Sequence, residues 1–293
     1  MNKFLAGLPR LAVIALAALV VALSPARAQT PPDSRLAAIA KTKTVKIAYR
    51  SEARPFSFLN DNKEIAGFSI DICKLVVNSM QQQLGIDQLK IEWVPVTIET
   101  RFSAVAEGKA DMECGSSTVT LGRMKVVDFS NYIFLESTGI LVKNDQNLRS
   151  FADLGGKKIA VIAGTTNERA IKLQAAQQKL DATIVPVKDR DEGVAMLESG
   201  AVNGYASDKL LLIGANFKNP GAVVILPDDL SVEPYAIVLP RGDWAFRLAV
   251  NTGLAQIYRS GQIIVLVNAW FERVGLHTGP ILRVMYGLGA LSD

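Results

Sequence analysis

Histidine and cysteine are scarce in this sequence of 293 residues. The single histidine, His277, excludes a site that holds a metal through several histidines, and it leaves no second base for a Ser-His-Asp or Cys-His arrangement. Cys73 and Cys114 are the two cysteines, and a disulfide requires that their Cα atoms lie within bonding range, which the sequence alone does not give. We therefore expect no metal, no cofactor and no such hydrolytic site.

Long runs of like charge are also missing. The net charge is +4, but basic and acidic residues are interspersed and no five consecutive residues carry the same sign. A nucleic-acid partner is therefore not expected. The chain has no G-x-x-x-x-G-K-[ST] phosphate-binding loop either, so we do not expect it to hydrolyse ATP itself.

The N-terminal apolar run, Leu11 to Leu23, is too short to cross a membrane, because about 13 residues fall below the roughly 18 that a spanning helix needs. Lys3 and Arg10 precede it, and the small residues of Ala26-Arg27-Ala28 follow it. This arrangement predicts a signal peptide over residues 1–28, cleaved near Ala28, and a mature periplasmic protein. An uncleaved anchor is the alternative.

Short β-branched runs alternate with longer segments of helical spacing along the rest of the chain. This alternation predicts βα units, mostly parallel sheets flanked by helices and an α/β fold. The expected strands are Val45–Arg50, Ile91–Val96, Ala110–Cys114, Lys158–Ile162, Thr183–Val187, Asn203–Ala206 and Tyr235–Leu239. Because these segments form two series of similar build, we expect two lobes.

The expected helices follow those strands. The segment Phe68–Met80 is predicted to start extended and to continue as a helix, because its later apolar residues have helical spacing. The other predicted helices are Arg101–Ala106, Asn167–Lys179, Glu192–Leu197, Trp244–Tyr258 and Gln262–Val274. Thr120 is the expected start of one more helix, which would carry Arg123.

Four motifs occur in an order typical of one protein family. They are the segment from Gly67 to Val76, Asp128-Phe129-Ser130, the segment from Asp153 to Thr166, and Glu198-Ser199-Gly200. Together they resemble the family 3 extracellular solute-binding proteins, which serve polar amino-acid ABC importers. The resemblance covers residues 36 to 275. Within the family, Glu113-Cys114-Gly115-Ser116, and Arg50 beside Pro55-Phe56-Ser57, are most similar to periplasmic glutamate/aspartate-binding proteins.

The resemblance implies a two-lobed periplasmic binding protein fold of type II-like topology. Lobe I would comprise residues 36–138 and 236–275, and lobe II residues 139–235. The two crossings near Glu136 to Ile140 and Pro234 to Ile237 would form a two-strand hinge. Residues 276–293 extend past the matched region and receive no role.

The resemblance also implies a clamp for the α-amino acid group. A buried ammonium needs a carboxylate, and a buried carboxylate needs a guanidinium with further donors. Arg123 would bind the α-carboxylate with Thr118 and Thr165, while Asp208 would bind the ammonium with Ser116. From the residues alone, Arg123 also fits a helix surface, Asp208 a helix cap and Thr165 a turn.

An acidic ligand side chain would face Arg50 and Arg101, the two lobe I arginines of the likened proteins. Ile98 departs from the pattern, because it stands where a hydroxyl residue assists the side-chain carboxylate. Arg190 stands at or near the position of a lobe II histidine. It either reaches the cleft or lies in a solvated charge cluster with the aspartates on each side of it. Phe56 is a secondary candidate for contact with the ligand, and core packing is its alternative.

The sequence therefore predicts a monomeric periplasmic protein that binds glutamate or aspartate by hinge closure and docks on an inner-membrane ABC permease. A binder of glutamine or asparagine, or a protein that reports to a receptor, remain alternatives. The main rival is a dehydratase-like enzyme on the same fold, related to cyclohexadienyl or arogenate dehydratases. Its general acid would be Glu99, Glu136 or Glu233.

Overall fold

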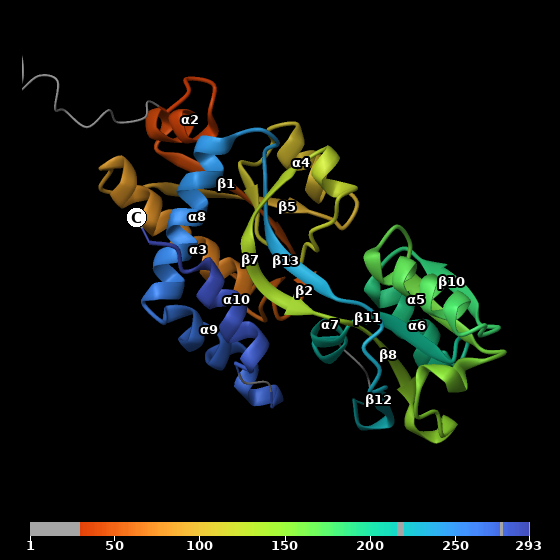
Figure 1. Cartoon of the computed structure of the whole chain (residues 1–293). Coiled ribbons are helices and arrows are strands. Elements are labelled where there is room, and N and C mark those ends of the chain that lie inside the picture. The colour runs from red at the N-terminus through yellow and green to blue at the C-terminus, as the bar shows by residue number, and fades with distance from the viewer. Residues whose placement is uncertain (1–29, 216–219, 276–277, 293) are drawn as a thin grey trace, which may run out of the picture.

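The computed structural model describes residues 30–215, 220–275 and 278–292. The expected signal peptide over residues 1–28 and His277 lie outside these ranges. Two α/β units, which we call lobe I and lobe II, are joined by two crossings of the chain (Figure 1). Among the described residues, no helix combines the length and the apolar character needed to span a bilayer.

Lobe I is built on a five-stranded sheet with the strand order β5-β1-β6-β13-β7. The pairings of β1 with β5 and β6 are parallel, and β13 runs against both of its neighbours. Four of the five strands therefore point the same way, as the sequence predicts. The strands are β1 (Thr44–Arg50), β5 (Lys90–Val96), β6 (Met112–Glu113), β7 (Asp128–Glu136) and β13 (Glu233–Leu239).

Helices cover both faces of this sheet (Figure 1). The larger core lies under α3, α8, α9 and α10, and a smaller one lies under α4. The lobe I helices are α2 (Arg35–Thr42), α3 (Phe68–Leu84), α4 (Arg101–Ala106), α8 (Trp244–Arg259), α9 (Gln262–Phe271) and α10 (Pro280–Gly289). In α10, which lies in the extension past residue 275, Leu282 and Tyr286 are buried, and the Tyr286 hydroxyl donates to the Ile133 carbonyl at 3.1 Å.

The start of α3 corrects the sequence interpretation, because the helix begins at Phe68 with no extended stretch inside it. Gly67 precedes it with φ of 139°, and a Cβ there would lie 2.1 Å from the Phe56 carbonyl oxygen. Only glycine fits this close approach, so the chain turns directly into the helix. At the other end Gly85 adopts the left-handed conformation typical of a helix C-terminus.

Lobe II is built on a second five-stranded sheet with the order β10-β9-β11-β8-β12. Here β8 is the strand that runs against its neighbours. The strands are β8 (Thr138–Lys143), β9 (Lys158–Ile162), β10 (Thr183–Val187), β11 (Gly204–Asp208) and β12 (Val223–Ile225). The helices are α5 (Thr166–Gln177), α6 (Arg190–Ser199) and α7 (Lys209–Ile213). The predicted strands over 158–162 and 183–187 have the bounds observed.

The chain leaves the first sheet at Glu136 and enters the second at Thr138, then returns to the first sheet at Glu233. The helix α7 lies at this junction, because its Leu210 and Leu211 pack into the lobe I core although α7 directly follows a lobe II strand. Beyond it, a Cβ on Gly214 would lie 2.4 Å from the Arg54 carbonyl oxygen. The two lobes are thus in close contact beside the crossings.

Short elements complete the chain. A small three-stranded sheet follows β1 and carries the Pro55-Phe56 turn. Its strands are β2 (Glu52–Ala53), β3 (Ser57–Leu59) and β4 (Ile65–Ala66), and the 3₁₀ helices are η1 (Arg123–Lys125), η2 (Asn144–Gln146), η3 (Phe151–Leu154), η4 (Pro220–Ala222) and η5 (Glu272–Val274). The helix expected from Thr120 is therefore only the three-residue η1, because β7 begins at Asp128 and leaves no length for an α-helix.

Candidate functional site

A cavity lies between the lobes, at the carboxyl ends of strands from both sheets. Arg50 ends β1, Ile162 ends β9 and Asp208 ends β11, and all three line it. Ligands of α/β proteins bind at this edge of a sheet. The structure brings all eight principal candidates of the sequence analysis to this one cavity: Arg50, Arg101, Ser116, Thr118, Arg123, Thr165, Arg190 and Asp208.

Arg123 projects from η1. The Thr120 hydroxyl accepts a hydrogen bond from its backbone N–H at 3.1 Å, so Thr120 anchors the turn. The Arg123 Nη1 donates to the Thr118 carbonyl at 2.6 Å, and the guanidinium carbon lies 4.9 Å from the centre of the Phe102 ring. Burial lowers the pKa of Arg123. These contacts orient a partly buried guanidinium and leave further N–H groups for a carboxylate.

Asp208 occupies the N-cap position of α7, but its side chain makes no capping bond. Instead its Oδ1 accepts a hydrogen bond from Asn167 Nδ2 at 2.9 Å. Burial, followed by the nearby Glu233, raises the pKa of Asp208 to about 6. The carboxyl is therefore ionised at neutral pH while it is 5% exposed, which is the state that a ligand ammonium requires.

Arg101 is the first residue of α4 and is 4% exposed. Its guanidinium carbon lies 4.8 Å from the Phe102 ring centre, but its Nε has no hydrogen-bond partner among the residues described. Burial, then Arg50 and Arg123, lowers its pKa to about 9. Arg101 therefore lines the cavity as a buried cation with one N–H donor that is unpaired within the described residues.

Arg50 has a partner, and this partner was not anticipated from the sequence. Its Nε donates to Glu52 Oε1 at 2.8 Å, and its Nη2 contacts the same oxygen. The remaining Nη1 lies 3.5 Å from Ser116 Oγ. Burial raises the pKa of Glu52, but the Arg50 charge and its hydrogen bond outweigh this and the net pKa is lowered. The ion pair neutralises part of the positive charge that the sequence interpretation assigned to the cleft.

Arg190 is the first residue of α6, and its side chain is buried rather than solvated, with 8% of the residue exposed. Asp189 caps this helix by accepting a hydrogen bond from the Glu192 N–H at 2.9 Å. Burial lowers the pKa of Arg190. The alternative of a solvated charge cluster is therefore wrong for Arg190, which lies in the cavity from the lobe II side.

Thr165 and Thr118 both line the cavity and also make hydrogen bonds within the protein. Thr165 is the N-cap of α5 and accepts from the Glu168 N–H at 3.1 Å, yet it also lines the cavity. Thr118 donates to Glu233 Oε2 at 2.7 Å and lies 3.5 Å, oxygen to oxygen, from Thr166 of lobe II. The Thr118 and Thr166 hydroxyls therefore meet across the two lobes.

Phe56 does not line this cavity, and its candidacy as a ligand contact is wrong. The ring is fully buried and packs at centroid distances of 5.0 Å from Tyr235 and 5.2 Å from Phe134. Phe68 and Phe271 complete this aromatic group. Each such pair adds about 0.5–1.5 kcal/mol beyond area burial, so the core holds Phe56.

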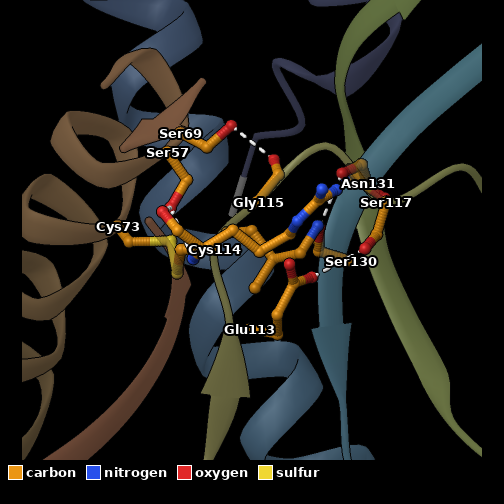
Figure 2. Close-up of a disulfide and its surroundings, with 11 residues drawn as sticks. Ser57, Ser69, Cys73, Glu113, Cys114, Gly115, Ser117, Ser130 and Asn131 are labelled. Carbon is orange, nitrogen blue, oxygen red and sulfur yellow. Dashed lines mark hydrogen bonds between the residues drawn. A yellow bond between two sulfur atoms is a disulfide. The ribbon is translucent and has the colours of Figure 1, made fainter. Parts of the chain in front are cut away.

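A disulfide anchors the segment that carries Ser116. Cys73 of α3 bonds to Cys114, which follows β6 directly, and their Cα atoms are 6.4 Å apart (Figure 2). The Ser69 hydroxyl donates to the Gly115 carbonyl at 2.7 Å, and Ser117 donates to Glu113 Oε2 at 2.8 Å. These bonds fix the backbone on both sides of Ser116 at the cavity.

Sequence reasoning missed Asn167 and Glu52 as parts of the site, and it considered Glu233 only as a general acid of the rival enzyme. Asn167 lines the cavity, and its amide also donates to Thr138 Oγ1 at 2.8 Å. Glu52 pairs with Arg50, and Glu233 is buried behind Thr118. The sequence signal that could have indicated Asn167 is its place in the first turn of the helix that follows Thr165. The contact from Glu233 joins residues 115 positions apart, and no local pattern reveals it.

Residues 45–273 match the bacterial extracellular solute-binding proteins, family 3. The chain belongs to this family. It is 35% identical to an L-glutamate/L-aspartate-binding protein of Pseudomonas aeruginosa over 80% of this chain and 79% of that protein. It is 30% identical to a glutamate/aspartate import solute-binding protein of Escherichia coli K12, over 90% and 88% of the two chains.

Among solved structures, the fold is similar to an ancestral amino acid-binding protein described as a precursor of cyclohexadienyl dehydratase. The TM-score is 0.68 at 30% identity, over 81% of this chain and 99% of that one. The family and the α/β fold expected from the motifs are thereby confirmed. The names of both relatives describe binding proteins.

Proposed function

We propose that this protein binds glutamate or aspartate in the interlobe cavity as the substrate-binding component of an ABC importer. One observation carries the choice of an acidic ligand: Arg101 and Arg190 are both buried at the cavity, and Arg101 Nε has no hydrogen-bond partner within the described part of the chain. Leaving two buried cations unpaired is costly, and a ligand side-chain carboxylate would pair with them.

The α-amino acid group would be held by Arg123 and Asp208. Arg123 and Asp208 carry charges opposite to those of the ligand carboxylate and ammonium. Arg123 Nη1 is also held in place by the hydrogen bond that it donates to the Thr118 carbonyl. Asp208 would neutralise the ligand ammonium and Arg123 the α-carboxylate, so Arg101 and Arg190 remain to favour an additional negative charge on the ligand. Arg50 contributes less positive charge to the ligand site than the sequence suggested, because it already forms an ion pair with Glu52.

The transport role follows from the relatives, whose names give glutamate/aspartate binding or import. In our proposal the mature chain is a periplasmic monomer, lobe I comprises residues 36–138 and 236–275, and lobe II comprises 139–235. Closure about the two crossings traps the ligand, and the closed form docks on an inner-membrane permease. The Thr118–Thr166 approach and the Gly214–Arg54 contact are consistent with lobes that can close on each other.

Isothermal titration of the purified mature protein with glutamate, aspartate, glutamine and asparagine tests this function. We expect glutamate or aspartate to bind most tightly, and Arg101→Met to reduce this affinity more than it reduces the affinity for glutamine. Thermal shifts across the twenty amino acids give an independent readout, because a ligand of the folded state raises its stability. A thermal shift with glutamine but none with either acid would refute the assignment.

We also propose that the protein is not an enzyme of the dehydratase kind. Glu99 is exposed and accepts a hydrogen bond from Thr97. Glu136 faces a separate groove at the crossings, and Glu233 is already bonded by Thr118 and Ser231. None of these three acids lines the interlobe cavity. Formation of product from prephenate or arogenate would overturn this proposal.

A further inference from the structure

Glu52 places a negative charge beside a cavity that the proposed function assigns to an anionic ligand. Its Oε1 accepts from Nε of Arg50 at 2.8 Å and also contacts Nη2. The Glu52 side chain is 41% exposed, whereas that of Arg50 is 5% exposed. The pair thus has its guanidinium inside the protein and its carboxylate towards solvent.

Glu52 also stands near an arginine of the other lobe. Glu52 and Arg190 both line a second hollow, which adjoins the cavity through Arg190. Burial is the main cause that lowers the pKa of Arg190; among its charged neighbours, Arg50 lowers this pKa by repulsion and Glu52 raises it by attraction. Arg50 and Arg190 come from opposite lobes and line one cavity, so the negative charge of Glu52 offsets the repulsion between them.

The hydrogen bonds of Glu52 orient Arg50 as well. They occupy the Nε and Nη2 positions, so that Nη1 is the donor directed towards Ser116 Oγ at 3.5 Å in the cavity. A glutamine at position 52 could keep the same acceptor oxygen, because its amide carbonyl replaces one carboxylate oxygen. The charge and the orientation can therefore be separated by substitution.

We propose, resting on the proposed function, that Glu52 is a positioning residue that acts through Arg50 and lowers the preference of the cleft for an acidic ligand over its amide. Glu52 partly neutralises Arg50 and so reduces the positive charge that faces the ligand side chain. Glutamate and glutamine have nearly the same shape and differ by one charge, so their affinity ratio reports this electrostatic effect directly.

Titration calorimetry of the mature protein with glutamate and glutamine tests the proposal. Removing one charge about 10 Å away at an effective dielectric constant of about 20 changes an affinity roughly tenfold. We therefore expect Glu52→Gln to raise the glutamate-to-glutamine affinity ratio about tenfold, and less at high salt. Glu52→Asp keeps the negative charge and should hold the ratio near that of the wild type.

The matched control is Asp61→Asn, which removes a fully exposed acid from the rim of the same hollow, 3.9 Å from Arg54. It should leave the ratio unchanged. An unchanged or lower ratio in Glu52→Gln, or an equal rise in Glu52→Asp, would overturn the inference while the proposed function stands. Failure of the wild type to bind either amino acid would overturn both.

Discussion

Replacing Asp208 by Asn should weaken ligand binding and strengthen the fold at the same time. The substitution removes the negative charge but keeps an oxygen that can accept the hydrogen bond from Asn167. Loss of one partner of a buried charge pair costs about 2 to 5 kcal/mol. The affinity for glutamate should therefore fall by roughly 30-fold to several thousand-fold.

The stability effect has the opposite sign. Burial and Glu233 raise the pKa of Asp208 from 3.8 to about 6 in the folded protein. An acid with a raised folded pKa costs stability as pH rises through this window, and the full cost is present above pH 6. A shift of about two units corresponds to roughly 3 kcal/mol, so at pH 7 the ligand-free Asp208→Asn variant should be more stable by up to about this amount.

Titration calorimetry and urea unfolding at pH 7 measure the two effects on one protein preparation. Asp229→Asn is the control, because Asp229 is 68% exposed and pairs with Lys209 away from the cavity. It should change neither affinity nor stability by more than about 1 kcal/mol. Unchanged glutamate affinity in Asp208→Asn would refute the ammonium site, and a loss of stability would refute the electrostatic reasoning.

Three further predictions concern pH, the hinge and the disulfide. Glutamate affinity should be constant between pH 7 and 8 and decline below pH 6 as Asp208, with its pKa of about 6, is protonated, which titrations at several pH values measure. Burial and Asp208 raise the pKa of Glu136 from 4.5 to about 8, so its ionisation should lower wild-type stability as pH rises from 4.5 to 8. Glu136→Gln should remove this contribution, leave the smaller fall due to Asp208, and gain up to about 5 kcal/mol in urea unfolding at pH 9. Equal stability of both proteins at pH 9 would contradict this. Because Cys73 and Cys114 are 41 positions apart, the double alanine variant should lose about 2 to 4 kcal/mol of unfolding free energy, and unchanged denaturant midpoints would contradict this.

The strands were predictable where a β-branched run is buried on both sides. Ile159 and Val161 of β9 are fully buried, and the prediction of residues 158–162 needed no other information. The helix at Thr120 could not be predicted correctly from a local signal. The threonine does accept a bond from the Arg123 N–H, but the start of β7 at Asp128 limits the turn to three residues.

The site was predictable to the extent that the family motifs carry it. Arg123 and Asp208 were predicted by resemblance, since their own surroundings in the sequence favour a helix surface and a cap. Phe56 was misplaced because its four ring neighbours come from segments as distant as Phe271. Long-range packing of this kind has no periodic signature in the sequence.

The proposed preference for an acidic ligand rests on Arg101 and Arg190, whereas the sequence first indicated Arg50 and Arg101. Arg50 is matched by Glu52, whereas Arg101 and Arg190 are buried from opposite lobes without an acid bonded to either within the described residues. A side-chain carboxylate between these two arginines would relieve their desolvation only when the lobes are closed, because one is contributed by each lobe. The same contact that selects an acid would then also stabilise the closed form, so selectivity and closure would have a common electrostatic cause.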